Sequence, residues 1–318
     1  MGAILVTGGA GFIGSHLCER LVAGGREVVC LDVFDSFYSK KLKLRNLESL
    51  KDADAFHLYE GDIRDPALLE DLFGHHTVEA VVHLAARAGV RPSLEMPRLY
   101  ADVNVTGTAA LLEHARIFRV PRFLFGSSSS VYGNSGEVPL SESARADEPV
   151  SPYAATKRAG ELLAYTSHHL YGLNVACLRF FTVYGPRQRP EMAIHKFTRL
   201  IDQGEAVPLF GDGGSSRDYT YVDDIVTGIE SALERARGYQ VFNLGRAEVV
   251  SLRELVTQIE SALGKKARIV HEASQPGDVR QTCADLTISR RVLGYEPKVG
   301  IEEGIRRFVD WYRAQPKS

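Results

Sequence analysis

Two residues of this 318-residue chain have side chains and a spacing suited to acid–base chemistry. Tyr153 and Lys157 are four residues apart in a stretch whose pattern predicts a helix to about residue 171, so they share one helix face. A free phenol has a pKa of ~10 and is a poor base at neutral pH. A cation held near the phenol favours the phenolate. We therefore predict a tyrosine base, although a helix face can also carry these two residues by chance.

A glycine-rich turn near the N-terminus supplies a second chemical signal. The apolar run 4–6 predicts a strand, and Gly8, Gly11 and Gly14 follow it before a helical pattern over 15–23. Such glycines permit a tight turn, close approach of the backbone to a pyrophosphate, and close packing of helix on strand. The helix N-terminus then offers unpaired N–H groups to phosphates. This order of strand, turn and helix predicts a dinucleotide site.

An acidic residue is in the position that such a site requires. Asp32 ends the second predicted strand, 27–31, and lies eighteen residues after Gly14. It is placed to accept hydrogen bonds from a ribose diol, and a carboxylate there repels a 2′-phosphate. The predicted cofactor is therefore NAD and not NADP. A glycine-rich turn with an incidental acid is the alternative interpretation.

Strand and helix patterns alternate through the first part of the chain. Further strands are predicted at 56–59, 80–84, 122–125 and 174–178, and helices at 66–73, 102–118 and 153–171. Alternation of this kind predicts an α/β fold of the Rossmann type, a doubly wound parallel sheet with helices on both faces. Ligands are then expected at the carboxyl ends of the strands.

After Arg179 the pattern changes to a smaller, mixed α/β region, which we expect to bind substrate. Residues 182–189 are predicted to form an irregular loop, and Ser251 with Glu254 is predicted to form a capping box. Helices are expected at 193–203, 223–236, 251–263, 286–293 and 301–312, and strands at 207–210, 218–222 and 241–244. The predicted division is a cofactor domain at 1–180, to which 223–247 returns, and a substrate domain formed by 181–222 and 248–318.

Composition excludes several classes of protein. The 38 basic and 40 acidic residues give a net charge of −2, which favours neither nucleic acid nor an anionic membrane as a partner. No apolar run approaches the ~20 residues of a membrane span. Four dispersed cysteines without a CxxC pair argue against structural zinc and disulfides. With no signal-peptide pattern, we expect a cytoplasmic protein without a metal site.

Together these motifs resemble the extended short-chain dehydrogenase/reductase family, over nearly the whole chain. The resemblance is carried by the glycine turn, His83-Leu84-Ala85-Ala86, the segment 127–133, Tyr153-x-x-x-Lys157, the segments 179–186 and 217–224, and Pro276-Gly277-Asp278. Members that combine these motifs act on nucleotide-sugars. The segments 88–95 and 181–190 are most similar to UDP-glucuronate 4-epimerases.

The resemblance implies a role for individual positions. Ser128 matches the catalytic serine or threonine that bonds the sugar O4, Tyr153 matches the general base and acid, and Lys157 matches the residue that binds the nicotinamide ribose and lowers the tyrosine pKa. The implied cofactor-binding residues are Gly8, Gly11, Phe12, Ile13, Gly14, Asp32, Asp62, Ile63, Leu84, Ala85, Ala86, Tyr153 and Lys157, with His83 in the cofactor wall. The implied substrate-binding residues are Arg91, Ser93, Ser128, Ser129, Ser130, Thr182, Arg189, Arg217 and Asp278. Gln275 replaces an arginine of UDP-galactose-type relatives, and Arg280 is the candidate to compensate for it.

The resemblance also implies a reaction, in which C4 of a UDP-sugar is oxidised and then reduced from the other face. Dehydratases of the family carry Asp-Glu directly after the catalytic residue, and decarboxylases usually keep the glutamate. This chain has Ser129 and Ser130 there, which favours simple return of hydride. Thr182 favours UDP-glucuronate over UDP-glucose or UDP-N-acetylglucosamine, because many neutral-sugar epimerases have Asn at that position. The remaining alternatives are a decarboxylase, a dehydratase and a non-catalytic NAD-binding sensor.

A uronate raises a stability problem, because a C4 ketone makes it a β-keto acid that loses CO₂ easily. We hypothesise that Ser129, Ser130 and Thr182 hold the carboxylate without repelling it and that Arg189 adds a charge-assisted bond. The family also implies a homodimer formed through the predicted helices 102–118 and 153–171.

Overall fold

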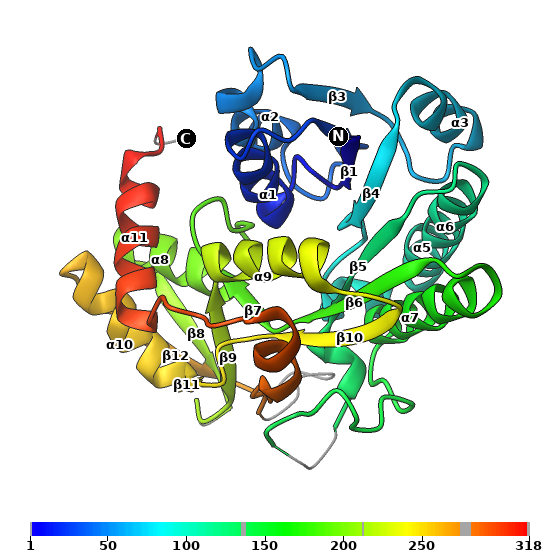
Figure 1. Ribbon diagram of the computed structural model, residues 1–318. Helices are drawn as coiled ribbons and strands as arrows, with labels where there is room; N and C mark the ends of the chain where they lie inside the picture. The colour runs from blue at the N-terminus through cyan, green and yellow to red at the C-terminus, as the bar shows by residue number, and fades with distance from the viewer. Residues whose placement is uncertain (1, 135–137, 212, 274–280, 317–318) are drawn as a thin grey trace.

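A parallel sheet is the centre of the computed structural model, which describes residues 2–134, 138–211, 213–273 and 281–316 (Figure 1). Within these residues seven strands lie in the order β10-β6-β5-β4-β1-β2-β3, and every neighbouring pair is parallel. The strands are β1 Ala3–Thr7, β2 Val28–Asp32, β3 Phe56–Glu60, β4 Val78–His83, β5 Arg122–Ser128, β6 Asn174–Phe180 and β10 Tyr239–Leu244. The strand order reverses between β1 and β4, where such sheets bind ligands. The predicted α/β fold of the Rossmann type is confirmed.

Alternate side chains of each strand pack on opposite faces of this sheet. Ile4 and Val6 belong to one apolar cluster, which includes residues of α1 (Phe12–Ala23) and α9 (Val222–Arg235). Leu5 belongs to a second cluster, with residues of the helices on the other face. Those helices are α3 Pro66–His75, α6 Gly107–Ile117 and α7 Pro152–Tyr171 (Figure 1). Because strand side chains alternate, a run such as Ile4-Leu5-Val6 supplies both cores at once.

The helix that carries the predicted base has clear signals at both ends. Ser151 accepts a hydrogen bond from the Ala154 N–H at 3.1 Å, and Pro152 occupies the first turn. Gly172 ends α7 in the left-handed region, with φ of 70°. These caps fix where α7 begins, and therefore where its first turn delivers Tyr153.

The second region contains two small sheets and interleaves with the first. One sheet has the order β11-β9-β7, and the other pairs β12 with β8. The elements are β7 Thr182–Tyr184, β8 Ala206–Phe210, β9 Ser216–Tyr221, β11 Val249–Ser251, β12 Arg268–Glu272, α8 Ala193–Gln203, α10 Leu252–Leu263 and α11 Ile301–Ala314. The capping box of Ser251 and Glu254 is confirmed. Strand β10 rejoins the main sheet, while the exact domain boundaries stay a prediction.

Several local predictions were wrong. The first three residues of the predicted loop 182–189 form β7, which pairs with β9, and neither β11 nor β12 was expected, because such short or exposed strands have little apolar pattern. The predicted helix 102–118 begins as a π-helix over Asp102–Thr106, and 286–293 is π-helical over Ser289–Leu293. The sequence pattern also did not predict the short helices α2 Lys40–Asn46, α4 Val90–Glu95, α5 Pro97–Ala101, Glu48–Leu50 and Ser129–Tyr132. None of the helices in the described residues has the length and apolar character needed to cross a membrane.

Candidate active site

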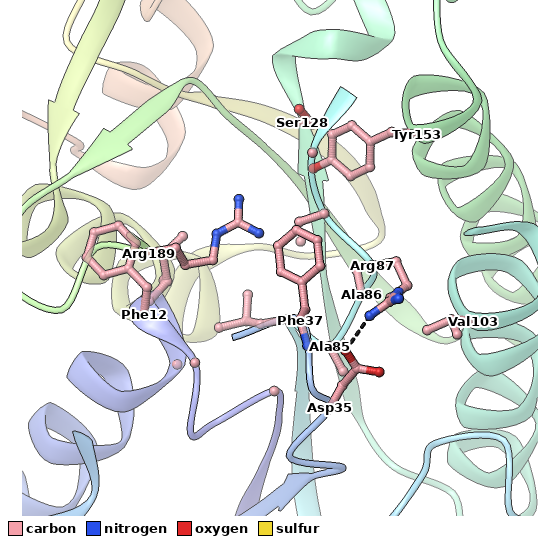
Figure 2. Close-up of a pocket in the computed structure, with 18 of the residues that line it drawn as sticks. Phe12, Asp35, Phe37, Ala85, Ala86, Arg87, Val103, Ser128, Tyr153 and Arg189 are labelled. Atoms are coloured by element: carbon pink, nitrogen blue, oxygen red, sulfur yellow. Dashed lines mark hydrogen bonds and ion pairs between the residues drawn. The ribbon is translucent and has the colours of Figure 1, made fainter. Parts of the chain in front are cut away.

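A pocket with a volume of about 450 Å³ opens at the carboxyl ends of β1, β2, β4 and β5 (Figure 2). It brings together the residues that the sequence assigned to the cofactor, with the exception of His83. Gly8, Gly11, Phe12, Ile13, Gly14, Asp32, Asp62, Ile63, Leu84, Ala85, Ala86, Tyr153 and Lys157 line it. Ser128 lines the same pocket, so the predicted catalytic residues and the predicted dinucleotide site form one continuous surface.

The glycine turn leaves a cradle that a side chain would fill. A Cβ atom on Gly14 would lie 2.3 Å from the Gly8 carbonyl oxygen and 2.7 Å from the Gly9 Cα, and Gly8 itself has φ of +71°. Gly11 precedes α1 and provides no side-chain cap, so among the described residues no side chain caps the first N–H groups of the helix. Backbone donors at a helix N-terminus are the usual site for a pyrophosphate. The residues present therefore fit a dinucleotide.

Asp32 is held at the end of β2 by contacts that the sequence did not reveal. Its carboxylate accepts hydrogen bonds from the N–H groups of Ala10, at 3.2 Å, and Phe34, at 2.8 Å. The buried ammonium of Lys43 lies 3.3 Å from the same carboxylate. These contacts orient the acid beside the pocket, and Lys43 offsets part of its charge. The discrimination against a 2′-phosphate that the sequence predicts therefore depends on this geometry as well as on the carboxylate charge.

The segment between β2 and α2 forms a wall of the pocket that has no sequence signal. The Phe37 ring has the guanidinium carbons of Arg87 and Arg189 each 5.5 Å from its centroid. Arg87 is also paired with Asp35 (Figure 2). The hydroxyl of Tyr38 is buried and has no hydrogen-bond partner among the described residues. A buried hydroxyl of this kind is available to a polar ligand.

The predicted catalytic residues converge from β5 and α7. Ser128 ends β5 and is hydrogen-bonded through its Oγ to the Ser130 hydroxyl and N–H, both at 3.1 Å. Tyr153 lies in the first turn of α7, and its hydroxyl is directed toward Ser128 (Figure 2). Lys157, one turn later, is buried and donates to the Gly126 carbonyl oxygen at 2.6 Å. The arrangement can place a sugar hydroxyl between a serine and a tyrosine.

The electrostatics of this group correct one expectation. Burial raises the pKa of Tyr153, while a hydrogen bond with Ser128 and the charge of Arg189 act against that rise. Lys157 was expected to lower the pKa of the phenol, but it is not one of the groups that do so in this structure. Its ammonium is directed to the Gly126 carbonyl, and burial lowers its own pKa to about 8.

A buried ion pair lies behind Lys157 and fixes α7 on the sheet. Glu161, which is fully buried, receives two hydrogen bonds of 2.8 Å from Arg179 of β6 and one of 2.7 Å from Ser127 of β5. Burial alone would raise the pKa of Glu161, but these bonds bring it below its ordinary value. The pair joins α7 to both strands and so holds the catalytic face of the helix.

His83 is a core residue. The sequence had suggested a place in the cofactor wall, and that prediction was wrong. Its ring is buried, with Nδ1 2.7 Å from the Thr7 hydroxyl and Nε2 3.0 Å from the Thr108 hydroxyl. Burial, and to a smaller degree the charge of Lys157, lowers the pKa of His83 to about 3. The imidazole therefore stays neutral and joins β1, β4 and α6 beneath the pocket.

The predicted substrate residues fall into three groups. The pocket is lined by Ser128, Ser129, Ser130, Thr182 and Arg189, but not by Arg91, Ser93 or Arg217. Ser93 is buried and donates to the Val90 carbonyl at 2.5 Å, and Arg217 donates to the Ser216 carbonyl at 2.9 Å. Asp278, Gln275 and Arg280 lie outside the described residues. The substrate roles of Arg91, Ser93, Arg217 and Asp278 stay predictions.

The pocket also shows residues that the sequence analysis did not find. Asp35, Phe37, Tyr38 and Arg87 come from irregular segments, where no periodic pattern predicts which side chain faces a ligand, and Lys43 comes from the short helix α2. Arg64 lies beside Asp62, one of the expected cofactor-binding residues, and its hydrogen bonds to the Asp62 carboxylate lower the pKa of that acid. Only Lys43 offered a signal, as a basic residue close in sequence to an acid at a strand end.

Several known proteins are similar to this chain both in sequence and in fold. A family model described as GDP-mannose 4,6 dehydratase matches residues 5–308. A UDP-glucuronate 4-epimerase of Thermodesulfobacterium geofontis (strain OPF15) is 42% identical over 312 residues, which are 98% of this chain and 96% of the relative. The structure of a Bacillus cereus UDP-glucuronic acid 4-epimerase in complex with UDP-glucuronic acid and NAD has a TM-score of 0.91 and 36% identity, covering 98% of this chain and 99% of the other. A Thermotoga maritima UDP-glucose 4-epimerase with UDP-glucose has the same TM-score and identity and covers 98% of both chains.

The fold and the pocket define a dinucleotide-binding enzyme with a serine and a tyrosine at the reacting end. Given the matches above, the chain belongs to the family of NAD-dependent nucleotide-sugar epimerases and dehydratases, part of the extended short-chain dehydrogenases/reductases.

Proposed function

We propose that this protein is a nucleotide-sugar 4-epimerase that converts UDP-glucuronate to UDP-galacturonate. The observation that carries the proposal is the composition of the pocket around Tyr153. Ser128, Ser129, Ser130, Thr182 and Arg189 line it, so hydroxyl groups and one guanidinium are offered to a sugar there. Directly after the catalytic serine, where dehydratases need an acid and a base, this chain has two neutral hydroxyls.

Each residue has a definite task in the reaction. Tyr153 accepts the proton of the C4 hydroxyl, Ser128 hydrogen-bonds O4, and the same tyrosine returns the proton after the sugar has turned its other face. NAD held by the glycine turn and Asp32 would supply the chemistry of a hydride acceptor and donor at C4, with no net consumption of the cofactor. Lys157, buried and bonded to the Gly126 carbonyl, would contribute to holding the nicotinamide ribose.

Arg189 is the pocket residue whose charge favours a uronate. Its guanidinium extends into the pocket toward the side where Phe37 and Tyr153 lie (Figure 2), and it can bind a carboxylate through charge-assisted hydrogen bonds. Its charge also lowers the pKa of Tyr153. An ion pair with Glu191, at 3.2 Å, fixes the base of the guanidinium. A carboxylate held by Arg189 and Thr182 would be turned away from the alignment that releases CO₂ from the ketone.

A neutral-sugar 4-epimerase is the second candidate. The Thermotoga maritima UDP-glucose 4-epimerase is as similar in fold as the UDP-glucuronic acid 4-epimerase, so overall similarity does not separate the two substrates. The separating feature is local. Thr182 and Arg189 both line the pocket, and a hexose without a carboxylate would leave the charge of Arg189 without a substrate partner.

The deciding experiment offers the purified enzyme UDP-glucuronate, UDP-glucose and UDP-N-acetylglucosamine separately and follows the products by NMR. We expect UDP-galacturonate from the first and far slower turnover of the other two. Faster turnover of UDP-glucose would show that the substrate is the neutral sugar and not the uronate. UDP-pentose or a 4-keto-6-deoxy product as the main species would place the chain among decarboxylases or dehydratases, and no product from any of the three would favour a non-catalytic sensor.

The predicted homodimer gains support from apolar side chains on α7 and at the end of α6. Leu162, Tyr165 and Tyr171 of α7 are 52%, 49% and 58% exposed, and Ile117 of α6 is 53% exposed. Exposed apolar groups gathered on neighbouring helices are typical of an interface. Leu162→Glu, which would place a charge there, is expected to shift the molecular mass measured by light scattering from dimer to monomer.

A further inference from the structure

Three side chains with metal-binding atoms meet at the end of the sheet opposite to the pocket. Glu27 directly precedes β2, His57 is the second residue of β3, and His76 directly follows α3. All three are partly exposed, with side-chain exposures of 43%, 37% and 13%. They therefore come from three different elements and remain accessible to an ion from solvent.

The separations of their ligand atoms suit a tetrahedral ion. His57 Nε2 is 3.1 Å and His76 Nδ1 is 3.7 Å from Glu27 Oε1, and one ligand atom from each residue lies within 4.8 Å of the others. Zinc bonds of about 2.0–2.1 Å at the tetrahedral angle place neighbouring ligand atoms ~3.3 Å apart. Small rotations of the side chains would bring the three atoms onto one ion, with water in the fourth position.

Tyr59 completes the arrangement from outside. Its hydroxyl is 2.8 Å from His76 Nε2, so the nitrogen of that ring not facing Glu27 already has a partner. Metal-binding histidines almost always have such a partner on the second nitrogen, which fixes the ring and its tautomer. The contact leaves His76 Nδ1 directed toward Glu27, at a distance too long for a direct hydrogen bond.

We propose that Glu27, His57 and His76 bind a transition-metal dication, with zinc as the reference ion. Two imidazoles and a carboxylate suit Zn²⁺, Ni²⁺, Cu²⁺ or Co²⁺ better than Mg²⁺ or Ca²⁺, which prefer all-oxygen sites. The sequence gives no signal of this site, because the cysteine spacing indicates no metal and these three residues are far apart along the chain. The parallel pairing of β2 with β3 and the end of α3 bring them together.

A metal here would stabilise the edge of the sheet. β3 is the edge strand, and the ion would join it to β2 and to the end of α3. The segment after β3 carries Asp62 and Ile63, which line the pocket. The expected consequence is a higher melting temperature with metal, whatever the sugar substrate is.

The test uses the full-length protein freed of metal by a chelator and titrated with Zn²⁺ alone, with calorimetry for binding and thermal unfolding for stability. We expect one saturable site and a rise in melting temperature in the wild type. The double variant of His57→Gln and His76→Gln should lose both effects. Tyr59→Phe should weaken binding by about 10-fold, as losses of such outer partners do.

The matched control is His75→Gln, which removes a neighbouring histidine that is 68% exposed and paired with Asp71. It should bind Zn²⁺ as the wild type does. Equal binding by the wild type and the double variant, or the absence of a saturable site in the wild type, would overturn the proposal. Melting temperatures of all variants in chelator show whether each is folded. The absorption spectrum of bound Co²⁺ shows whether the ligands are histidines or the thiolate of Cys283.

Discussion

The cofactor end and the sugar end of the pocket are held in different ways. At the cofactor end, Gly14 lies in the first turn of α1, Asp32 ends β2 and Lys157 lies in the second turn of α7, and each lies close to backbone atoms of another segment. At the sugar end, Thr182 comes from a three-residue strand and Arg189 from an irregular segment, where it is paired with the half-exposed Glu191.

This difference separates the parts of the site that the fold requires from those that set specificity. A change at the cofactor end disturbs backbone packing, whereas a change at the sugar end mainly alters which group a side chain can bind. The separation explains how relatives with a TM-score of 0.91 to this chain can be named for different sugars. Four predictions test it.

The largest effect is expected where the two ends meet, at Tyr153. Tyr153→Phe removes the group that accepts and returns the proton, and kcat should fall by about 10²–10⁴-fold or more. NAD affinity should be nearly unchanged, because the ring remains. Stopped-flow measurement of reduced nicotinamide and calorimetric binding of NAD check the two parts. Tyr165→Phe, on the exposed side of α7, is the control, and epimerisation retained by Tyr153→Phe would contradict the mechanism.

Gly14→Ala should show that the cofactor end depends on the backbone. The added Cβ would lie 2.3 Å from the Gly8 carbonyl, so the turn has to move, at a cost of about 1–3 kcal/mol. NAD affinity should fall together with the free energy of unfolding. The matched control is Gly74→Ala in α3, where a Cβ meets nothing within 4 Å. It should stabilise the protein by about 0.5–1 kcal/mol. A similar response of the two variants would contradict the claim that backbone packing at Gly14 holds the cofactor end.

Arg189→Ala should change specificity without disturbing the fold. Loss of a charged hydrogen bond worth about 1.5–3 kcal/mol predicts a 10–100-fold fall in kcat/KM for UDP-glucuronate, with more UDP-pentose by-product and an unchanged melting temperature. The pH–rate profile should also move to higher pH, because Arg189 lowers the pKa of Tyr153. Arg199→Ala, on α8 and paired with Glu205, is the control. Unchanged turnover and product ratio would exclude the carboxylate contact.

The last prediction concerns Lys157 and pH. The pKa of Lys157 is about 8 in the folded protein and 10.5 ordinarily. Between these pH values the unfolded chain therefore binds more protons than the folded chain. Stability should therefore rise with pH in that window, by up to about 1.4 kcal/mol per pH unit. Chemical denaturation at several pH values gives the free energy of unfolding of the wild type and of Lys157→Met. The difference between the two slopes of this free energy against pH is the contribution of Lys157. Parallel curves would show that the ammonium is not desolvated as the contact with Gly126 implies.

The sequence by itself determined the parts that depend on local pattern. Alternating strand and helix signals predicted the parallel sheet, and the spacing of Gly8, Gly11 and Gly14 placed the dinucleotide turn. The four-residue spacing of Tyr153 and Lys157 placed both on one helix face, and all of these residues line the pocket. Each depends on backbone geometry within one or two elements, which neighbouring residues dictate.

Only the tertiary structure decided which distant side chains meet. It placed Lys43 against Asp32, Phe37 between two guanidinium groups, and the Lys157 ammonium on the Gly126 carbonyl. It also put His83 in the core. These contacts join segments whose separation in the chain carries no periodic signal, so they follow from how the strands pair and how the loops pack across them.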